Sequence, residues 1–136
     1  MIGTVTDNLR LFSVSLLALL TLAACAQTPR SESDVDDALT DMSLLRDRTV
    51  SSIRDYRIDG WRYVDRYNVI LTAGRNENYL VTFMTPCLGL NGSFSIGFTS
   101  SAGGVTQFDD IVVRGPGGRT EVCPIKEILR LKNSDN

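Results

Sequence analysis

Two adjacent carboxylates, Asp109 and Asp110, are the side chains of this sequence that could most readily share acid–base work. They lie between Phe108 and Ile111, in a segment whose composition is typical of a β-strand. Because successive side chains of a strand point to opposite faces, the two carboxylates would not act together on one substrate. We expect one of them to point inward or to lie at a bend, where it would accept hydrogen bonds from the backbone or from an arginine.

Other catalytic arrangements lack a partner residue in this chain. The sequence has 136 residues and no histidine, which excludes imidazole bases and histidine-ligated zinc. Its only lysines are Lys126 and Lys132, and neither a Ser-His-Asp nor an S-x-x-K pattern occurs. The glycines at 103–104 and 115–118 do not match a phosphate-binding loop and are typical of turns. The sequence therefore predicts a protein that is not an enzyme, with no catalytic residue, metal or cofactor; a carboxylate-only hydrolase is the weakest alternative.

Ligand binding is indicated by arginines that alternate with aromatic residues between positions 54 and 67. These residues are Arg54, Arg57, Arg62 and Arg66, among Tyr56, Trp61, Tyr63 and Tyr67. Guanidinium and aromatic groups together can hold a polyanion, a glycan or a lipid headgroup. We therefore take Trp61, Arg62 and Tyr63 as the candidate binding surface. The alternative is a solvated strand face, on which the aspartates at 55, 59 and 65 pair with the arginines.

The first of three cysteines follows an apolar segment. Leu11 to Ala24 reads LFSVSLLALLTLAA, which is too short for a comfortable membrane span of about 20 residues and is typical of a secretory signal. It ends in Leu22-Ala23-Ala24-Cys25, which resembles the bacterial lipobox, where small residues precede a cysteine that receives lipid. We predict a lipoprotein signal peptide at residues 1–24 and lipidation of Cys25. The alternative is an ordinary signal peptide with a chance cysteine.

The residue after Cys25 bears on the destination of the protein. In the usual Gram-negative sorting logic, an aspartate there favours retention in the inner membrane, and this sequence has Ala26. The resemblance to the lipobox therefore implies anchoring in the outer membrane, facing the periplasm.

The net charge of -2 gives no basic excess for binding nucleic acid.

The other two cysteines, Cys87 and Cys123, would meet an oxidising compartment, where disulfides form and persist. On the chain-entropy model, a bond between them would stabilise the fold by about 3.8 kcal/mol. Redox-active pairs usually lie close together, as in C-x-x-C, and these two cysteines do not. We predict a structural disulfide, with a redox-active pair or free thiols as the alternative.

The mature chain has room for one small domain, because 43% of the residues are hydrophobic and 22% are charged. Residues 25–49 are expected to form the lipidated tether and a short amphipathic helix. Apolar residues recur at nearly helical spacing between Asp34 and Thr49, and Ser33 is a plausible N-cap. Residues 50–132 are expected to form a β-rich domain, followed by a frayed tail at 133–136.

The β-rich part alternates short strand patterns with turn residues. Strands are predicted within 53–67, at 67–73, 79–84, 93–99 and 105–114, and from 119; Gly60 indicates a bend or bulge. The segments 67–73 and 79–84 form the clearest hairpin. Residues 125–131 fit a strand and a helical turn about equally well. The predicted fold is mainly β, a small antiparallel sheet, barrel or sandwich, with a short N-terminal helix and one disulfide.

Several short motifs resemble an uncharacterised family of small Gram-negative envelope proteins. They are Gly60-Trp61-Arg62, Tyr79-Leu80-Val81, Cys87-Leu88-Gly89-Leu90, Phe108-Asp109-Asp110 and Cys123-Pro124-Ile125, and the resemblance covers about residues 53–131. It implies a secreted β-rich domain with paired cysteines. It brings no activity, substrate or catalytic residue with it.

These observations lead to one expected function and one main alternative. We expect a lipid-anchored, non-enzymatic interaction or envelope module, whose partners are the membrane and an envelope protein. The alternative is a domain that binds a small molecule or a glycan around Trp61.

Overall fold

The computed structural model describes residues 31–54, 58–93, 95–100 and 103–135. The predicted signal peptide, Cys25 and most of the tether lie outside these residues. Within them, no helix has the length and hydropathy needed to cross a membrane.

One α-helix, α2 (Glu32–Asp41), opens the described chain. The N-cap residue is Ser31, two residues before the predicted N-cap Ser33. The backbone N–H of Ser31 donates to Asp34 Oδ2 at 3.2 Å. The prediction of a helix up to residue 49 is wrong. Ser43 adopts a positive φ of 57°, which stops the helix, and Leu44 begins a strand that pairs with the C-terminal strand.

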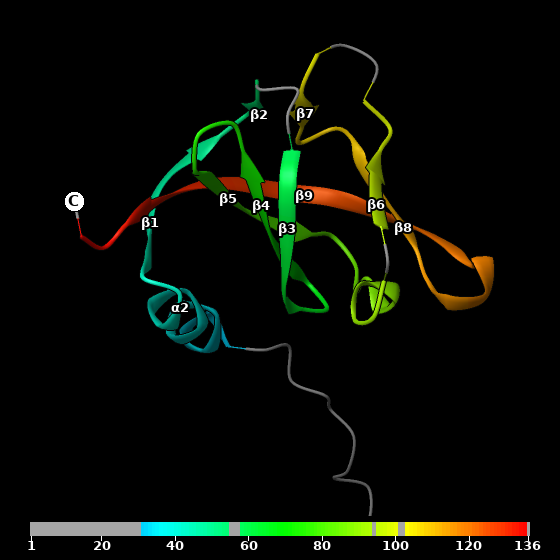
Figure 1. Cartoon of the computed structure of the whole chain (residues 1–136), viewed down its shortest axis with the longest axis horizontal. Helices are drawn as coiled ribbons and strands as arrows, with labels where there is room; N and C mark the ends of the chain where they lie inside the picture. Colours follow the sequence, from blue (N-terminus) through cyan, green and yellow to red (C-terminus); the bar gives the residue numbers. More distant parts are fainter. Residues whose placement is uncertain (1–30, 55–57, 94, 101–102, 136) are drawn as a thin grey trace, which may run out of the picture.

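Nine strands follow in the described residues. They are β1 (Leu44–Val50), β2 (Ser52–Ile53), β3 (Ile58–Asp65), β4 (Asn68–Ala73), β5 (Glu77–Phe83), β6 (Ser95–Phe98), β7 (Val105–Thr106), β8 (Asp110–Arg114) and β9 (Thr120–Asn133). Short 3₁₀ turns occupy Leu88–Leu90 and Pro116–Gly118. The mainly antiparallel β fold with one short helix is therefore confirmed (Figure 1).

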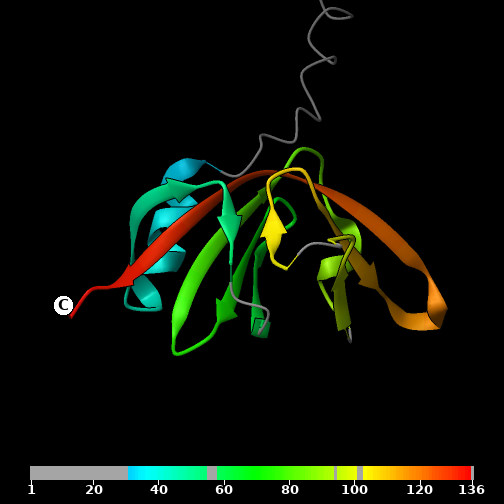
Figure 2. The same ribbon diagram turned by 90° about the horizontal axis from the view of Figure 1, so that it is seen from above.

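The long strand β9 organises a seven-stranded sheet of order β3-β4-β5-β9-β8-β6. Its second half pairs with β5 along one edge, while β8 and then β1 pair with successive parts of the other edge. Figure 2 shows β9 arching across the molecule, and the sheet curls with it. The segment 125–131, which the sequence left open between helix and strand, is thus strand.

The two faces of this sheet bury two separate cores. The inner core gathers residues of β4, β5, β8 and β9 with Ile53 of β2 and Val105 of β7, so the sheet curls around it. The helix-side core joins Val35 and Leu39 of α2 to Leu44, Ile70, Leu80 and other residues of the opposite face. Side chains of one strand alternate between the two cores, as Leu80 and Val81 do.

The disulfide between Cys87 and Cys123 is present, with the two Cα atoms 5.6 Å apart. Both cysteines are buried in the inner core. The bond joins the loop after β5 to β9 across a sequence separation of 36 residues. The predicted structural pairing is confirmed.

Three further expectations meet the structure at particular residues. The pairing of β3 with β4 shifts register between Ile58 and Gly60, which confirms the irregularity predicted at Gly60. The single strand predicted over 105–114 is wrong, since a turn at 107–109 divides it into β7 and β8. At the start of the tail predicted over 133–136, Asn133 pairs with Leu44 and the Ser134 N–H donates to the Ser43 carbonyl.

Candidate functional site

The Asp109 carboxylate holds a turn together. Its Oδ2 accepts hydrogen bonds from the Thr106 backbone N–H at 2.7 Å and from Thr106 Oγ1 at 2.8 Å. The Asp109 N–H in turn donates to the Thr106 carbonyl. Asp110 lies beyond the turn as the first residue of β8, and its backbone pairs with Thr99. The bend predicted for one of the two carboxylates is therefore found at Asp109, with hydrogen bonds from the backbone.

The predicted surface of Trp61, Arg62 and Tyr63 is divided between the two faces of the sheet. All three lie on β3, at the edge of the sheet. Trp61 is half-buried and packs against the inner core, and Tyr63 pairs with Val69 on that same face. Arg62 pairs with Ile70, a residue of the helix-side core, so it points the other way. The three residues are neighbours in sequence without forming one surface.

A more coherent polar site lies on the other side of the sheet, under α2. We call it the helix-side groove; it has a volume of about 440 Å³. Its lining comes from α2, from four strands and from the segments beside them. The lining residues are Glu32, Val35, Arg46, Tyr67, Asn68, Thr82, Phe83, Met84, Lys126 and Glu127.

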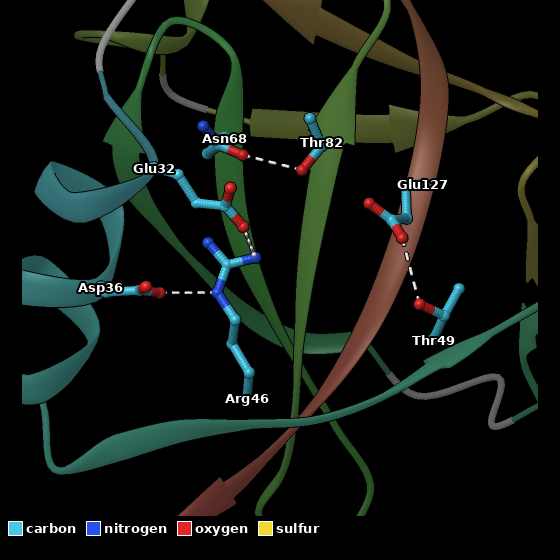
Figure 3. A network of polar contacts seen from close by, with 7 residues as sticks. All are labelled: Glu32, Asp36, Arg46, Thr49, Asn68, Thr82 and Glu127. Atoms are coloured by element: carbon cyan, nitrogen blue, oxygen red, sulfur yellow. Dashed lines mark hydrogen bonds and ion pairs between the residues drawn. The ribbon is translucent and has the colours of Figure 1, made fainter.

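The floor of the helix-side groove is a row of polar side chains across three adjacent strands. Asn68 of β4 is the register partner of Thr82 of β5, which is in turn the partner of Glu127 of β9. Thr82 Oγ1 donates to Asn68 Oδ1 at 2.8 Å, and Thr49 Oγ1 of β1 donates to Glu127 Oε1 at 3.0 Å (Figure 3). These contacts fix the orientation of the row.

Asp65 supports one end of this row. It is buried, and both of its carboxylate oxygens accept hydrogen bonds from Asn68 Nδ2 at 3.1 Å. Asp65 Oδ1 also accepts the Tyr67 backbone N–H at 2.6 Å. The Asn68 side-chain amide donates to Asp65, so the side-chain carbonyl oxygen of Asn68 is directed to Thr82 and accepts its hydroxyl.

Arg46 closes the side of the groove nearest the helix. Its Nε lies 2.6 Å from Asp36 Oδ1, and its Nη1 lies 3.5 Å from Glu32 Oε1. Figure 3 shows both acidic side chains reaching from α2 toward the guanidinium. The two ion pairs join α2 to β1 along this side of the groove.

The chemistry of the helix-side groove is mixed and electrically balanced. Arg46 and Lys126 contribute two positive charges, and Glu32 and Glu127 contribute two negative ones. Met84 adds an apolar side chain that is 62% exposed. Hydrogen-bonding groups of both kinds beside an exposed methionine match an extended peptide, which carries donors, acceptors and apolar side chains in alternation.

A third cluster, Cys87, Glu121 and Cys123, brings metal-ligand atom types within 4.8 Å of one another. Its two sulfur atoms are joined in the disulfide. The Glu121 carboxylate accepts the backbone N–H groups of Leu88 at 3.1 Å and Gly89 at 2.5 Å. Glu121 therefore clamps the loop that the disulfide already holds, and the cluster has a structural role.

Sequence reasoning missed the helix-side groove because its residues come from distant segments. Glu32 and Glu127 stand at opposite ends of the described chain, and no local motif connects them. A polar residue next to an apolar strand segment could have indicated the groove. Asn68, which precedes the run Val69-Ile70-Leu71, is such a residue.

Comparison with known proteins gives a family without a function. Residues 8–135 match a family of unknown function, DUF6491. No curated protein and no solved structure matches the chain. Since the match covers nearly the whole sequence, the chain belongs to this family, and the resemblance to an uncharacterised family is confirmed.

Proposed function

We propose that this member of a family of unknown function is a non-enzymatic binding module of the cell envelope, which holds an extended segment of a partner protein in its helix-side groove. The observation that carries the proposal is the polar row of Asn68, Thr82 and Glu127 beside the exposed Met84. The row offers fixed hydrogen-bonding groups, and the methionine offers adaptable apolar contact.

The proposal places the module on the outer membrane, facing the periplasm, with Cys25 as the lipid-bearing residue. The lipobox-like Leu22-Ala23-Ala24-Cys25 supports the anchor, and the buried disulfide suits an oxidising compartment. Six Cα–Cα steps separate Cys25 from Ser31, where the described domain begins, so this stretch reaches at most about 20 Å. The partner segment would therefore be one that comes close to the membrane surface.

The Asp109 carboxylate accepts two hydrogen bonds from Thr106 within the turn, so it gives no support to a carboxylate-only hydrolase. The alternative function, binding of a small molecule, is supported by a different groove, which is lined by Arg48, Arg54 and Arg130.

Photocrosslinking in the intact envelope tests the proposed interaction. A photoreactive residue at Met84 should give a discrete crosslinked protein. The same residue at Phe108, which is 88% exposed and does not line the groove, serves as the control. Equal crosslinking from both positions, or none from Met84, would contradict docking in the helix-side groove.

A further inference from the structure

A second groove lies on the inner face of the sheet, where β1 and β5 flank β9. It has a volume of about 700 Å³, within the range of roughly 300–1,000 Å³ that is common for small-molecule sites. We call it the arginine groove. Its lining includes Arg48, Ser51, Ser52, Arg54, Glu77 and Arg130.

The strand register brings two arginines of this groove face to face. Arg48 of β1 is the direct partner of Arg130 of β9, and Arg130 is the direct partner of Tyr79 of β5. Like charges on directly opposed strand positions repel one another. Arg54, which follows β2, adds a third guanidinium to the same lining.

The negative charges found in the described part of this lining do not balance the three arginines. Arg130 Nη2 lies 2.8 Å from Glu77 Oε1, and Tyr79 Oη donates to Glu77 Oε2 at 2.8 Å. Among the residues that the structure describes, Glu77 is the one carboxylate that lines the groove. Arg48 meets Asp47 at 3.7 Å outside the lining, through a side chain that is 63% exposed, and water screens such a pair strongly. The part of the lining that lies within the described ranges therefore carries three positive charges and one negative charge.

We infer that the arginine groove binds a phosphate monoester. Such a group carries a charge of about -1.5 to -2 at pH 7 and three strong acceptor oxygens. That charge matches the excess of two in the lining, and the planar guanidinium groups can hold phosphate oxygens in pairs. Ser51 and Ser52 line the same groove, and serine hydroxyls are further possible donors to phosphate oxygens. The ligand would also relieve the repulsion between Arg48 and Arg130.

The phosphate could belong to a lipid headgroup or to a soluble molecule, and calorimetry on the full-length protein in neutral detergent micelles separates the two. One titration adds glycerol 3-phosphate, with glycerol as its control. The other adds phosphatidic acid to the micelles, with phosphatidylcholine as its control. Binding of glycerol 3-phosphate assigns a soluble ligand, and binding of phosphatidic acid alone assigns a headgroup. No binding in either titration overturns the inference.

Substitutions locate the binding within the molecule. The double change Arg48→Gln with Arg54→Gln should weaken phosphate binding at least tenfold. The change Arg119→Gln, at an exposed arginine just before β9 and outside the groove lining, should leave it unchanged. The change Glu77→Gln should strengthen binding severalfold, because it removes the carboxylate that occupies Arg130. A gain in affinity cannot arise from misfolding. Unchanged affinity in the double variant and in Glu77→Gln would overturn the site, and it would leave the helix-side groove untouched as a proposal.

Discussion

Ile125 and Ile128 pack into the same inner core, although three positions separate them on one strand. The register of β9 against β5 explains this arrangement. Thr82 pairs with Glu127 and Phe83 pairs with Ile125, so the register passes over Lys126. This β-bulge turns Ile128 back to the inner core, and it turns Glu127 to the helix-side groove, which the regular alternation would not do.

Deleting Lys126 should therefore make the ladder between β5 and β9 regular and leave the domain folded, at a cost of about 1–2 kcal/mol or less. Without the bulge residue, Ile125 and Ile128 stand two positions apart and both stay on the inner face, with Glu127 between them on the helix side. Deleting Thr82 from the partner strand β5, which has no bulge, should instead lower the stability by several kcal/mol, because Phe83 would move off the inner face. Urea denaturation of the two variants makes the comparison. A loss as large for the Lys126 deletion as for the Thr82 deletion would show that Lys126 is not the extra residue of a bulge.

The same bulge explains why the sequence left this segment open between strand and helix. Apolar residues at 125 and 128 have the three-residue spacing of a helix, and a bulged strand produces the same spacing. The β4–β5 hairpin was predictable, because a run of apolar and β-branched residues precedes clear turn residues. The predicted helix was too long because Leu45 continues the helical spacing of apolar residues. In the structure, the positive φ of Ser43 ends the helix, and the residues from Leu44 pair with β9 instead.

The candidate surfaces were predictable only in part. A run of neighbouring residues such as Trp61, Arg62 and Tyr63 reads as one patch in the sequence, but a strand sends Arg62 to the other face. Both grooves are built from residues of several strands. Arg48 and Arg130 are brought together by the pairing of β1 with β9, which cannot be predicted from a local sequence pattern.

The disulfide should contribute a large share of the stability of this small domain. We expect Cys87→Ser to lower the free energy of unfolding by roughly 2–5 kcal/mol, because the unfolded chain gains freedom and a buried contact is lost. Urea denaturation of the oxidised protein and the variant measures the difference. Intact masses before and after reduction should differ by two hydrogens, and equal masses would mean that the two thiols are free.

Gly104 should not tolerate a side chain. A Cβ atom there would lie 2.4 Å from the Ile53 carbonyl oxygen, so the contact between β7 and β2 would have to open. We expect Gly104→Ala to destabilise the fold by about 1–3 kcal/mol. Gly97→Ala is the matched control, since its nearest neighbour would be 3.9 Å away. The melting temperatures of both variants test this, and a normal melting temperature for Gly104→Ala would contradict the close approach of β2 and β7.

The Asp109 carboxylate should matter to stability. The change Asp109→Ala removes both hydrogen bonds with Thr106 and leaves the Thr106 N–H without this acceptor, at a cost of about 1–3 kcal/mol. Asp110→Ala should cost less, because Asp110 bonds to Thr99 through its backbone N–H and carbonyl, which alanine keeps. Urea denaturation curves of the two variants compare their free energies of unfolding. A larger loss for Asp110→Ala would reverse the roles assigned here.

The most direct test of the central claim is the crosslinking yield from Met84 when the charge of the helix-side groove is changed. Glu127→Arg reverses one charge in the polar row and should abolish the crosslinked protein. Lys132→Glu, an exposed change near the end of β9 and outside the groove lining, should preserve it. Matching melting temperatures establish that both variants are folded. A crosslink from Met84 that survives Glu127→Arg at full yield would contradict the helix-side groove as the docking site.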